Sequence, residues 1–293
     1  MQYGLEISRK FPLKSRKTGQ KVEITIFERV CARDYSIVRN ENMRQEIAKV
    51  MALRDVAEGI FELELYAPGI CSDMVMPGQF VQVSLKDESR ILARPISVRD
   101  VLGDDIVLTI QKKGEGTRQL SRLNVGDDLK LTGCMGNGFD WDDEGNYILV
   151  GGGIGMAPIL FLQGRMRARS RLLAGFRSAC YAFGTENAIV ATEDGTLGER
   201  GFVTAPLERE ILSERPDCVM CCGPTPMLRA VQEICNRLGV RCQLSLEERM
   251  GCGLGACLVC NCKIKQKHGD GWDYKRVCVD GPVFDASEVV FDG

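Results

Sequence analysis

Histidine is almost absent from this chain of 293 residues, which contains only one, His268. It lies in the polar stretch KQKHGDGWDY, where we expect a surface position rather than a catalytic one. Chemistry that depends on an imidazole general base is therefore disfavoured. Net charge is also nearly absent, at −2 for the whole chain, which argues against a strong field that would attract nucleic acid or a membrane surface.

Long apolar runs are missing as well. Residues 1–20 lack the unbroken apolar core of a signal peptide. The most apolar stretch, residues 147–162, is interrupted by glycines and by Pro158 and falls short of a membrane span. We therefore expect a soluble, cytoplasmic protein.

Cysteine, by contrast, is plentiful, with 14 in the chain. The cytosol keeps thiols reduced, so clustered cysteines in a cytosolic chain indicate a metal site rather than disulfides. In GCGLGACLVCNC (251–262), Cys252, Cys257 and Cys260 are spaced C-x4-C-x2-C, and Cys278 follows. This is the ligand order of a plant-type [2Fe–2S] cluster, in which three thiolates share a tight loop. The glycines between them let the backbone bend and turn its N–H groups toward the sulfides.

Two other interpretations of these cysteines stay open. Zinc also accepts four thiolates, although structural zinc sites usually present two separated pairs rather than three ligands on one loop. The thiols could alternatively be incidental buried groups that pack as small apolar side chains. Cys262 is an extra thiol beside the ligand run, and we interpret it as packing.

Residue texture divides the chain into parts. Residues 1–43, with nine Lys or Arg against five Asp or Glu up to residue 41, form an N-terminal extension that is either a solvated tail or a contact for an acidic partner. The next part, 44–143, holds closely spaced short strands and turn residues, which predict an antiparallel barrel. The predicted strands are 22–27 in the extension and 60–68, 78–85, 94–101, 105–114 and 127–133 in the barrel.

Residues 144–243 alternate strands with helices, which predicts a parallel α/β domain of the nucleotide-binding sort. The predicted strands are 147–153, 179–185, 218–223 and 240–247, and the predicted helices are 155–169 and 224–239. Residues 244–293 are rich in glycine and cysteine and form a small third domain. The expected fold is thus a multidomain α+β chain.

Two motifs on the predicted barrel indicate a flavin dinucleotide. RPIS (94–97) ends a strand, where an arginine can pair with a diphosphate and a serine can bond an isoalloxazine edge. GEGT (114–117) opens a helix-like stretch whose N–H groups can receive phosphate. For either motif alone, a structural arginine or a plain turn is the default interpretation, whereas the two together on one barrel indicate a flavin dinucleotide site. The candidate FAD contacts are Arg94, Pro95, Ile96, Ser97, Gly116 and Thr117.

Two strand-to-helix turns indicate a nicotinamide dinucleotide. VGGGIGMAPIL (150–160) lets the backbone approach a pyrophosphate at a helix N-terminus, although it departs from the G-x-G-x-x-G fingerprint. CCGPTPML (221–228) is a second such turn. Tight packing of either turn is the competing interpretation. The candidate NAD contacts are Gly151, Gly152, Gly153, Gly155, Cys222, Gly223 and Pro224.

The order of these motifs, RPIS, GEGT, GGGIGMAP, CGP and MGCGLGACLVC…VCVDGPVF, resembles the electron-transfer subunit of class 1B, NAD-dependent dihydroorotate dehydrogenase. That family belongs to the ferredoxin–NADP reductase superfamily. The resemblance covers about residues 44–293, and the cysteine loop with CVDGPVF (278–284) is its most specific part.

The resemblance implies an FAD-binding barrel, a nicotinamide domain and a C-terminal [2Fe–2S] domain. It implies a partner subunit that binds FMN and oxidises dihydroorotate to orotate in pyrimidine biosynthesis, with two copies of each chain in a heterotetramer. Electrons would then pass through the cluster and FAD to NAD. It also adds FAD contacts on one strand and places the cluster ligands on Cys252, Cys257, Cys260 and Cys278. The added FAD contacts are Thr109, Ile110 and Gln111.

Residues 1–41 depart from the family pattern and leave room for another partner. A related subunit of bifurcating NADH-dependent ferredoxin:NADP oxidoreductases shares the architecture but has an aspartate in place of one cluster cysteine, and all four positions are cysteine here. A redox-sensing or scaffold protein that keeps the fold without turnover is a third hypothesis. No basic residue adjoins Asp194 in ATEDGTLGERGF, as a 2′-phosphate would require, so NAD is preferred over NADP.

Overall fold

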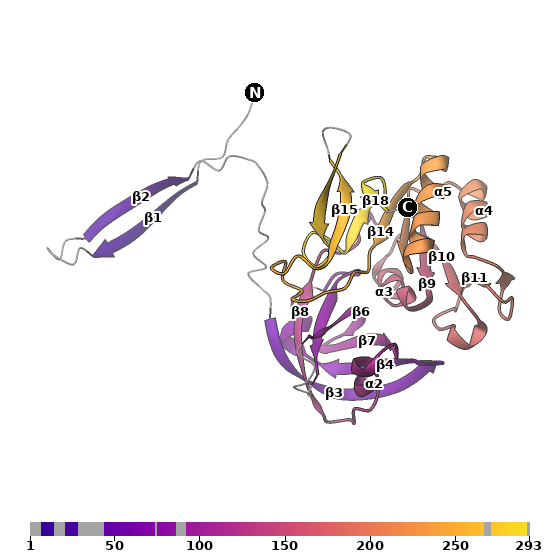
Figure 1. The fold of residues 1–293 in the computed structure, drawn as a ribbon, viewed down its shortest axis with the longest axis horizontal. Helices are drawn as coiled ribbons and strands as arrows, with labels where there is room; N and C mark the ends of the chain where they lie inside the picture. The colour runs from indigo at the N-terminus through magenta and orange to yellow at the C-terminus, as the bar shows by residue number, and fades with distance from the viewer. Residues whose placement is uncertain are drawn as a thin grey trace. The chain divides into compact units, whose positions relative to one another are not determined.

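The structure is a computed structural model that describes residues 7–14, 21–28, 44–73, 75–85, 92–266 and 271–291. His268 and Cys31 lie outside the described residues. The chain divides into two units, Met1–Asn40 and Glu41–Gly293 (Figure 1). The first unit contains an antiparallel pair, β1 (Ile7–Lys14) and β2 (Lys21–Glu28), which confirms the strand predicted at 22–27.

The larger unit begins with a closed antiparallel barrel in the order β3-β4-β7-β6-β5-β8. Two short helices, α1 (Pro68–Cys71) and α2 (Glu115–Leu120), accompany it. The strands are β3 (Arg44–Ala57), β4 (Ile60–Tyr66), β5 (Phe80–Ser84), β6 (Arg94–Leu102), β7 (Asp105–Gln111) and β8 (Asp128–Met135). The five strands predicted from residue 60 onward are therefore confirmed.

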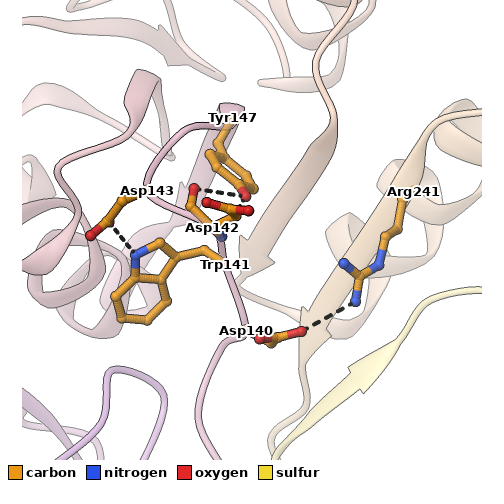
Figure 2. Close-up of a pocket in the computed structure, with 6 residues that line it drawn as sticks. All are labelled: Asp140, Trp141, Asp142, Asp143, Tyr147 and Arg241. Atoms are coloured by element: carbon orange, nitrogen blue, oxygen red, sulfur yellow. Dashed lines mark hydrogen bonds and ion pairs between the residues drawn. The ribbon is translucent and has the colours of Figure 1, made fainter.

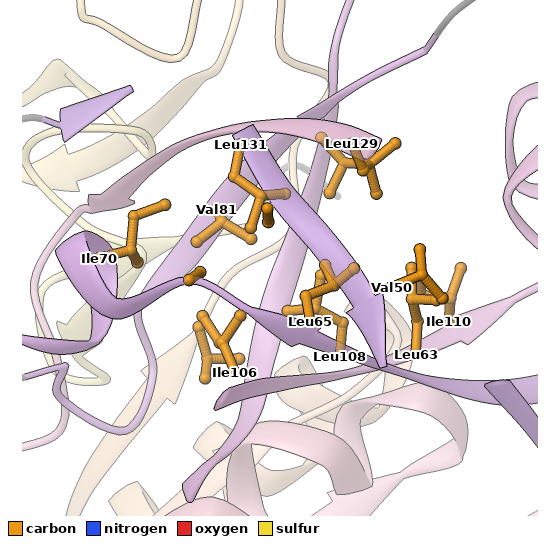
Figure 3. Packing of buried hydrophobic residues seen from close by; sticks show 14 of the residues in the cluster. Val50, Leu63, Leu65, Ile70, Val81, Ile106, Leu108, Ile110, Leu129 and Leu131 are labelled. Carbon is orange, nitrogen blue, oxygen red and sulfur yellow. The ribbon is translucent and has the colours of Figure 1, made fainter. Parts of the chain in front are cut away.

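Apolar side chains fill the barrel (Figure 3). In β4, Phe61, Leu63 and Leu65 are fully buried, whereas the residues between them, Glu62 and Glu64, are partly exposed. This period of two is what a strand with one face on a core requires. The barrel interior is thus a packed core, and its cofactor chemistry has to lie on the outer face or at the rim.

The longest strand, β3, was not predicted as a strand. Its register shifts twice against β4, between Val50 and Ala52 and between Asp55 and Ala57. Each shift is a β-bulge, which inserts a residue and breaks the period of two that sequence patterns reveal. The apolar positions of β3 therefore fall out of alternation although Ala48 and Val50 are fully buried.

After the barrel, a seven-stranded sheet has the order β12-β11-β10-β9-β13-β14-β17. All its strands pair in parallel except β17, which is antiparallel to β14. The strands are β9 (Asn146–Gly152), β10 (Arg169–Phe176), β11 (Ala188–Thr192), β12 (Glu199–Arg200), β13 (Cys218–Cys222), β14 (Arg241–Ser245) and β17 (Val283–Asp285). The helices are η1 (Gly153–Gly155), α3 (Met156–Arg165), η2 (Ala179–Tyr181), α4 (Thr204–Ser213) and α5 (Thr225–Leu238).

Helices cover both faces of this sheet. The apolar core on one face joins Ile148 and Val150 of β9 to residues of α4 and α5. The core on the other face joins Leu149 of β9 to residues of α3. The helix predicted over 224–239 is confirmed, with Pro224 at its N-cap and Gly239 in the left-handed conformation at its C-cap (φ 66°).

The strand predicted at 179–185 is wrong. That segment is the short 3₁₀ helix η2 followed by a loop, and the sheet position beside β9 belongs to β10. The predicted helix over 155–169 also ends earlier, at Arg165, because β10 begins at Arg169. The apolar character of 179–185 serves packing instead, since Phe183 is buried against Phe176 with ring centroids 6.0 Å apart.

The C-terminal part adds a small antiparallel sheet in the order β16-β15-β18. Its strands are β15 (Asn261–Lys265), β16 (Trp272–Arg276) and β18 (Val289–Val290). Between β16 and β18 the chain crosses into the large sheet as β17. None of the helices in the described part of the chain combines the length and apolarity that a bilayer crossing requires.

Asn137, in the linker after β8, fastens the barrel to the segment that leads into β17. Its side chain donates to the carbonyl of Val283 (2.9 Å) and accepts from the Val283 N–H (2.9 Å). Its backbone N–H also donates to the carbonyl of Gly281 (2.6 Å). The segment after Cys278 is thereby joined to the barrel as well as to the sheet.

Replacing Asn137 by alanine removes both side-chain hydrogen bonds to Val283. We expect Asn137→Ala to lower the free energy of unfolding by about 1–2 kcal/mol, measured by urea denaturation. Asn236→Ala, at an exposed position of α5, is the control and should change it by less than about 0.5 kcal/mol. Equal effects of the two variants would contradict the role of Asn137.

Candidate functional site

The cluster loop, residues 251–260, turns its backbone toward a cysteine sulfur. The Sγ of Cys252 accepts hydrogen bonds from the N–H groups of Leu254 (3.2 Å) and Cys257 (3.4 Å). Gly253 and Gly255 permit this turn because both adopt positive φ, 70° and 80°. The loop thus has the backbone-to-sulfur contacts expected from its glycines.

These contacts favour the thiolate form of Cys252. Burial acts to raise the pKa of this thiol, but hydrogen bonds from the loop N–H groups outweigh it and lower the pKa to about 7. The thiolate is the form that binds metal. The lowered pKa of Cys252 is therefore consistent with its predicted role as a ligand.

Cys260, at the end of the loop, forms a second pair with Cys278. Cys260 is 2% exposed and Cys278 is fully buried, and both belong to one apolar core with Phe80 of the barrel. Burial, and then the neighbouring Cys260 thiol, raise the pKa of Cys278 to about 12. The backbone also joins the two segments, since the Val277 N–H donates to the Cys260 carbonyl (2.8 Å).

Arg276 links the Cys278 segment to the cluster loop. Its guanidinium forms an ion pair with Asp280 (2.9 Å) and donates to the carbonyl of Gly255 (3.3 Å). Burial acts to raise the pKa of Asp280, but the arginine outweighs it and lowers that pKa below its usual value. Through Arg276, the turn that carries Cys278 is therefore bound both to Asp280 and to the backbone of the cluster loop.

The donor set fits an iron–sulfur cluster. Among the described residues, no three Cys, His, Asp or Glu side chains are gathered closely enough to hold a single metal ion. The four cysteines instead lie as the pair Cys252 and Cys257 and the pair Cys260 and Cys278. Four sulfur ligands, with N–H groups directed at one of them, are the ligands and surroundings of a [2Fe–2S] cluster.

Cys262 packs against the apolar core that contains Cys260 and Cys278. Its thiol is partly buried at the start of β15, and burial, followed by the charge of Glu248, raises its pKa to about 12. A protonated, partly buried thiol is consistent with packing.

The two flavin motifs meet in space. A Cβ built on Gly116 would lie 2.6 Å from Nε and 2.7 Å from Nη2 of Arg94, so the guanidinium rests directly on the glycine. The Arg94 guanidinium also donates to the carbonyl of Leu92. Thr117 closes the first turn of α2, where its hydroxyl donates to the Gly114 carbonyl (3.0 Å) and accepts from the Lys113 N–H (3.0 Å).

The other candidate flavin residues lie on the neighbouring strands β6 and β7. Pro95 and Ser97 of β6 stand opposite Gln82 and Phe80 of β5. On β7, Thr109 is buried and its hydroxyl donates to Glu62 (3.4 Å). The remaining candidates are Ile96 and Ile110, which pack on the barrel core, and Gln111, which ends β7.

The two candidate nicotinamide turns also meet, at the carboxyl ends of the adjacent strands β9 and β13. A Cβ on Gly155 would collide with the carbonyl of Cys222 and lie 2.7 Å from the N of Gly223. Gly153 differs, because it has φ 53° and nothing within 4 Å of its would-be Cβ. The remaining members, Gly151, Gly152 and Pro224, are packed on methionine side chains or cap α5.

The glycines of this run therefore differ in their surroundings. Gly155 is required for close packing, whereas Gly153 presents open backbone toward solvent. Burial raises the pKa of the Cys222 thiol to about 12, which favours its protonated form. Its contribution to the turn is the backbone carbonyl that Gly155 contacts.

Two pockets lie away from these residues. The first, about 700 Å³, is lined by Asp140, Trp141, Asp142, Asp143, Tyr147 and Arg241. Figure 2 shows that its polar groups form hydrogen bonds with one another. The Tyr147 hydroxyl forms hydrogen bonds with the Asp142 backbone, and the Trp141 indole donates to Asp143 (3.0 Å). The second pocket, about 420 Å³, lies between the barrel and the sheet and includes Glu62 and Arg99. No predicted site residue lines either pocket.

Sequence reasoning missed several residues that organise the site. Asn137 and Arg276 act through contacts distant in sequence, to Val283 and Gly255, which no local motif reveals. Asp280 pairs with Arg276, four residues before it. Gln82 is buried beside the cluster loop, where a Cβ on Gly253 would lie 2.5 Å from its Nε2. The sequence offered one signal for Gln82, namely that it is a polar residue in the middle of the otherwise apolar stretch FVQVS.

Comparisons with known proteins agree with this geometry. A family described as the iron-sulfur cluster binding domain of dihydroorotate dehydrogenase B matches residues 247–290. The chain is 41% identical over 249 residues to the dihydroorotate dehydrogenase B (NAD(+)), electron transfer subunit, of Caldanaerobacter subterraneus subsp. tengcongensis, which covers 83% of this chain and 98% of the relative. The subunit of the same name from Clostridium perfringens is 37% identical over 255 residues, with 83% and 97% covered.

Solved structures share the fold. The NADH-dependent reduced ferredoxin-NADP oxidoreductase superposes with a TM-score of 0.73 at 26% identity, covering 84% of this chain and 90% of that one. A ferredoxin reductase in carbazole 1,9a-dioxygenase superposes with a TM-score of 0.57 at 20% identity, covering 68% and 67%.

A barrel followed by a parallel sheet and a cysteine loop defines the class of ferredoxin reductase-like oxidoreductases that carry an iron–sulfur domain. Within this class, the chain belongs to the family of electron transfer subunits of NAD-dependent dihydroorotate dehydrogenase B. The family resemblance drawn from the motifs is thereby confirmed.

The placement of the cysteines predicts how two serine variants differ. Cys278→Ser should abolish the cluster and leave FAD bound, because a serine hydroxyl replaces a buried thiolate ligand. Cys262→Ser, the control, should keep both. Iron and acid-labile sulfide content and the flavin absorption spectrum measure the outcome, and unchanged iron and sulfide in Cys278→Ser would refute the ligand assignment.

Proposed function

We propose that this chain relays electrons from a catalytic subunit that oxidises dihydroorotate, with FMN, to NAD. Dihydroorotate gives up two electrons and two protons as it becomes orotate, and NAD takes two electrons and one proton to become NADH. The chain itself holds a [2Fe–2S] cluster, FAD and the NAD site. The partner performs the carbon chemistry, so this chain needs no general base.

One observation carries this proposal: the cluster loop lies against the barrel next to the flavin motif. Gly253 of the loop contacts Gln82 of β5, and Gln82 stands opposite Pro95 of the RPIS motif on β6. Electron transfer requires donor and acceptor to be close. This contact supports a path from the cluster to the flavin without a separate mobile carrier.

We assign one task to each part of the chain. Residues 44–143 bind FAD, 144–243 bind NAD and 244–293 bind the cluster, while 1–43 form an extension. Cys252, Cys257, Cys260 and Cys278 hold the cluster. When bound, FAD converts single-electron transfer into hydride transfer.

The chain's own residues bind and orient the cofactors. The Arg94 guanidinium, seated on Gly116, supplies a fixed positive charge for the FAD diphosphate. Gly153 leaves open backbone for the NAD pyrophosphate at the start of α3. Gly155 allows the two nicotinamide turns to touch, so that the carboxyl ends of β9 and β13 face one site.

We propose NAD rather than NADP mainly because of the family, and the residues around Asp194 give weaker support. In the structure Thr196 binds that carboxylate through its hydroxyl (2.6 Å) and its N–H (3.0 Å). The aliphatic part of the Arg200 side chain packs on Gly195, the residue after Asp194. A basic residue is therefore close to this loop in space, although none adjoins Asp194 in the sequence. NAD(+) is the cofactor in the names of the relatives.

We further propose that the chain works in the cytoplasm as a heterotetramer with two catalytic subunits. A second candidate function is supported by the similarity to the NADH-dependent reduced ferredoxin-NADP oxidoreductase. In that case NADH and a ferredoxin, rather than dihydroorotate, would exchange electrons with this chain.

The deciding experiment is an anaerobic purification with the subunit that co-purifies, followed by dihydroorotate and then NAD. We expect the visible flavin and cluster bands to bleach on the first addition and to recover on the second, with NADH formed. NADP in place of NAD should restore the bands more slowly. If only NADH bleaches them and dihydroorotate has no effect, the dihydroorotate function is wrong and the second candidate is favoured.

A further inference from the structure

Gln82 is a buried polar side chain on the outer face of the barrel. In β5, Val81 and Val83 belong to the barrel core, so the residues that alternate with them, Phe80 and Gln82, point out of the barrel. Phe80 packs in the apolar core that contains Cys278. Gln82 is only 3% exposed and therefore lies between the barrel and the cluster loop.

The amide of Gln82 has no protein partner. Neither Nε2 nor Oε1 forms a hydrogen bond with any group in the described parts of the chain. Pro95, opposite Gln82 on β6, has no N–H to offer its oxygen. An unsatisfied buried polar group destabilises the folded state, so native proteins rarely leave one without a partner.

The contacts of Gln82 point to the missing partner. A Cβ on Gly253 would lie 2.5 Å from Nε2 and 3.2 Å from Cδ, so the amide lies directly on the loop residue that follows Cys252. The N–H groups of Leu254 and Cys257 already bind the Cys252 sulfur. An additional donor at this position would face the same sulfur-rich site.

We propose that Gln82 is a positioning residue for the [2Fe–2S] cluster, donating a hydrogen bond from Nε2 to a sulfur atom at the cluster. This inference rests on the proposed function, because it requires the cluster to be bound. A hydrogen bond to a cluster sulfur stabilises the added negative charge of the reduced state and raises the reduction potential. Gln82 thus tunes the cluster from the flavin-binding domain, next to the RPIS strand.

The test is a redox titration of the purified complex, following the EPR signal of the reduced cluster. Gln82→Leu removes the donor, and Gln82→Glu keeps the size but replaces the donor with an acceptor. Both variants should shift the cluster midpoint potential to more negative values, Gln82→Glu further because it adds negative charge. Gln45→Leu, at an exposed glutamine of β3 on the same barrel, is the control and should leave the potential unchanged.

The outcomes separate this inference from the proposed function. A wild-type complex without flavin or cluster signals would overturn both. Normal wild-type signals, with both Gln82 variants at the wild-type potential, would overturn the role of Gln82 alone. If Gln82→Leu fails to retain the cluster, the potential of the isosteric Gln82→Glu decides the question.

Discussion

The arrangement of the redox sites depends on the burial of one segment, the residues around Cys278 that run into β17. This segment contacts the barrel through Phe80 and Asn137, and β17 pairs with β14 in the large sheet. It therefore joins the barrel, the sheet and the cluster loop. The Cys278 side chain cannot move without disturbing the apolar core, so its position relative to the barrel is fixed by packing rather than by a linker.

Glycine has two different functions at the predicted cofactor sites. At Gly116 and Gly155 the missing side chain makes room for protein atoms, the Arg94 guanidinium in one case and the Cys222 carbonyl in the other. At Gly153 a Cβ would meet nothing within 4 Å, so the backbone there is open. A glycine motif in a sequence combines both kinds of residue, and only the neighbouring atoms distinguish them.

Much of the architecture was predictable from local patterns. The barrel strands from residue 60 onward are short and apolar and are set off by turn residues, and β4 alternates buried and partly exposed positions. The helix at 224–239 carries a proline and a glycine at its two ends. The bulged strand β3 was missed because its alternation is broken. Strand β10 was missed because arginines occupy two of its first three positions, so its start does not look like a buried strand. Arg171 in β10 is partly buried, where it binds the Glu210 side chain of α4 and the carbonyl of Glu214, the residue after α4. The sequence alone does not reveal that these partners are available.

The candidate site shows the same limit. Cysteine spacing and glycine turns are local, so the ligand run and both dinucleotide motifs could be found in the sequence. Gln82, Arg276 and Asn137 gain their importance from contacts with residues far along the chain. Their roles depend on the folded arrangement, which the sequence pattern does not contain.

The central claim is that one chain holds a flavin and a cluster in electronic contact with NAD. The most direct measurement is an anaerobic titration of the purified chain with NADH, followed by absorbance and EPR. We predict that the flavin bands bleach, that the reduced-cluster signal develops, and that the end point corresponds to about three electrons per chain, two for the flavin and one for the cluster. A flavin that is reduced while the cluster stays oxidised would contradict the account.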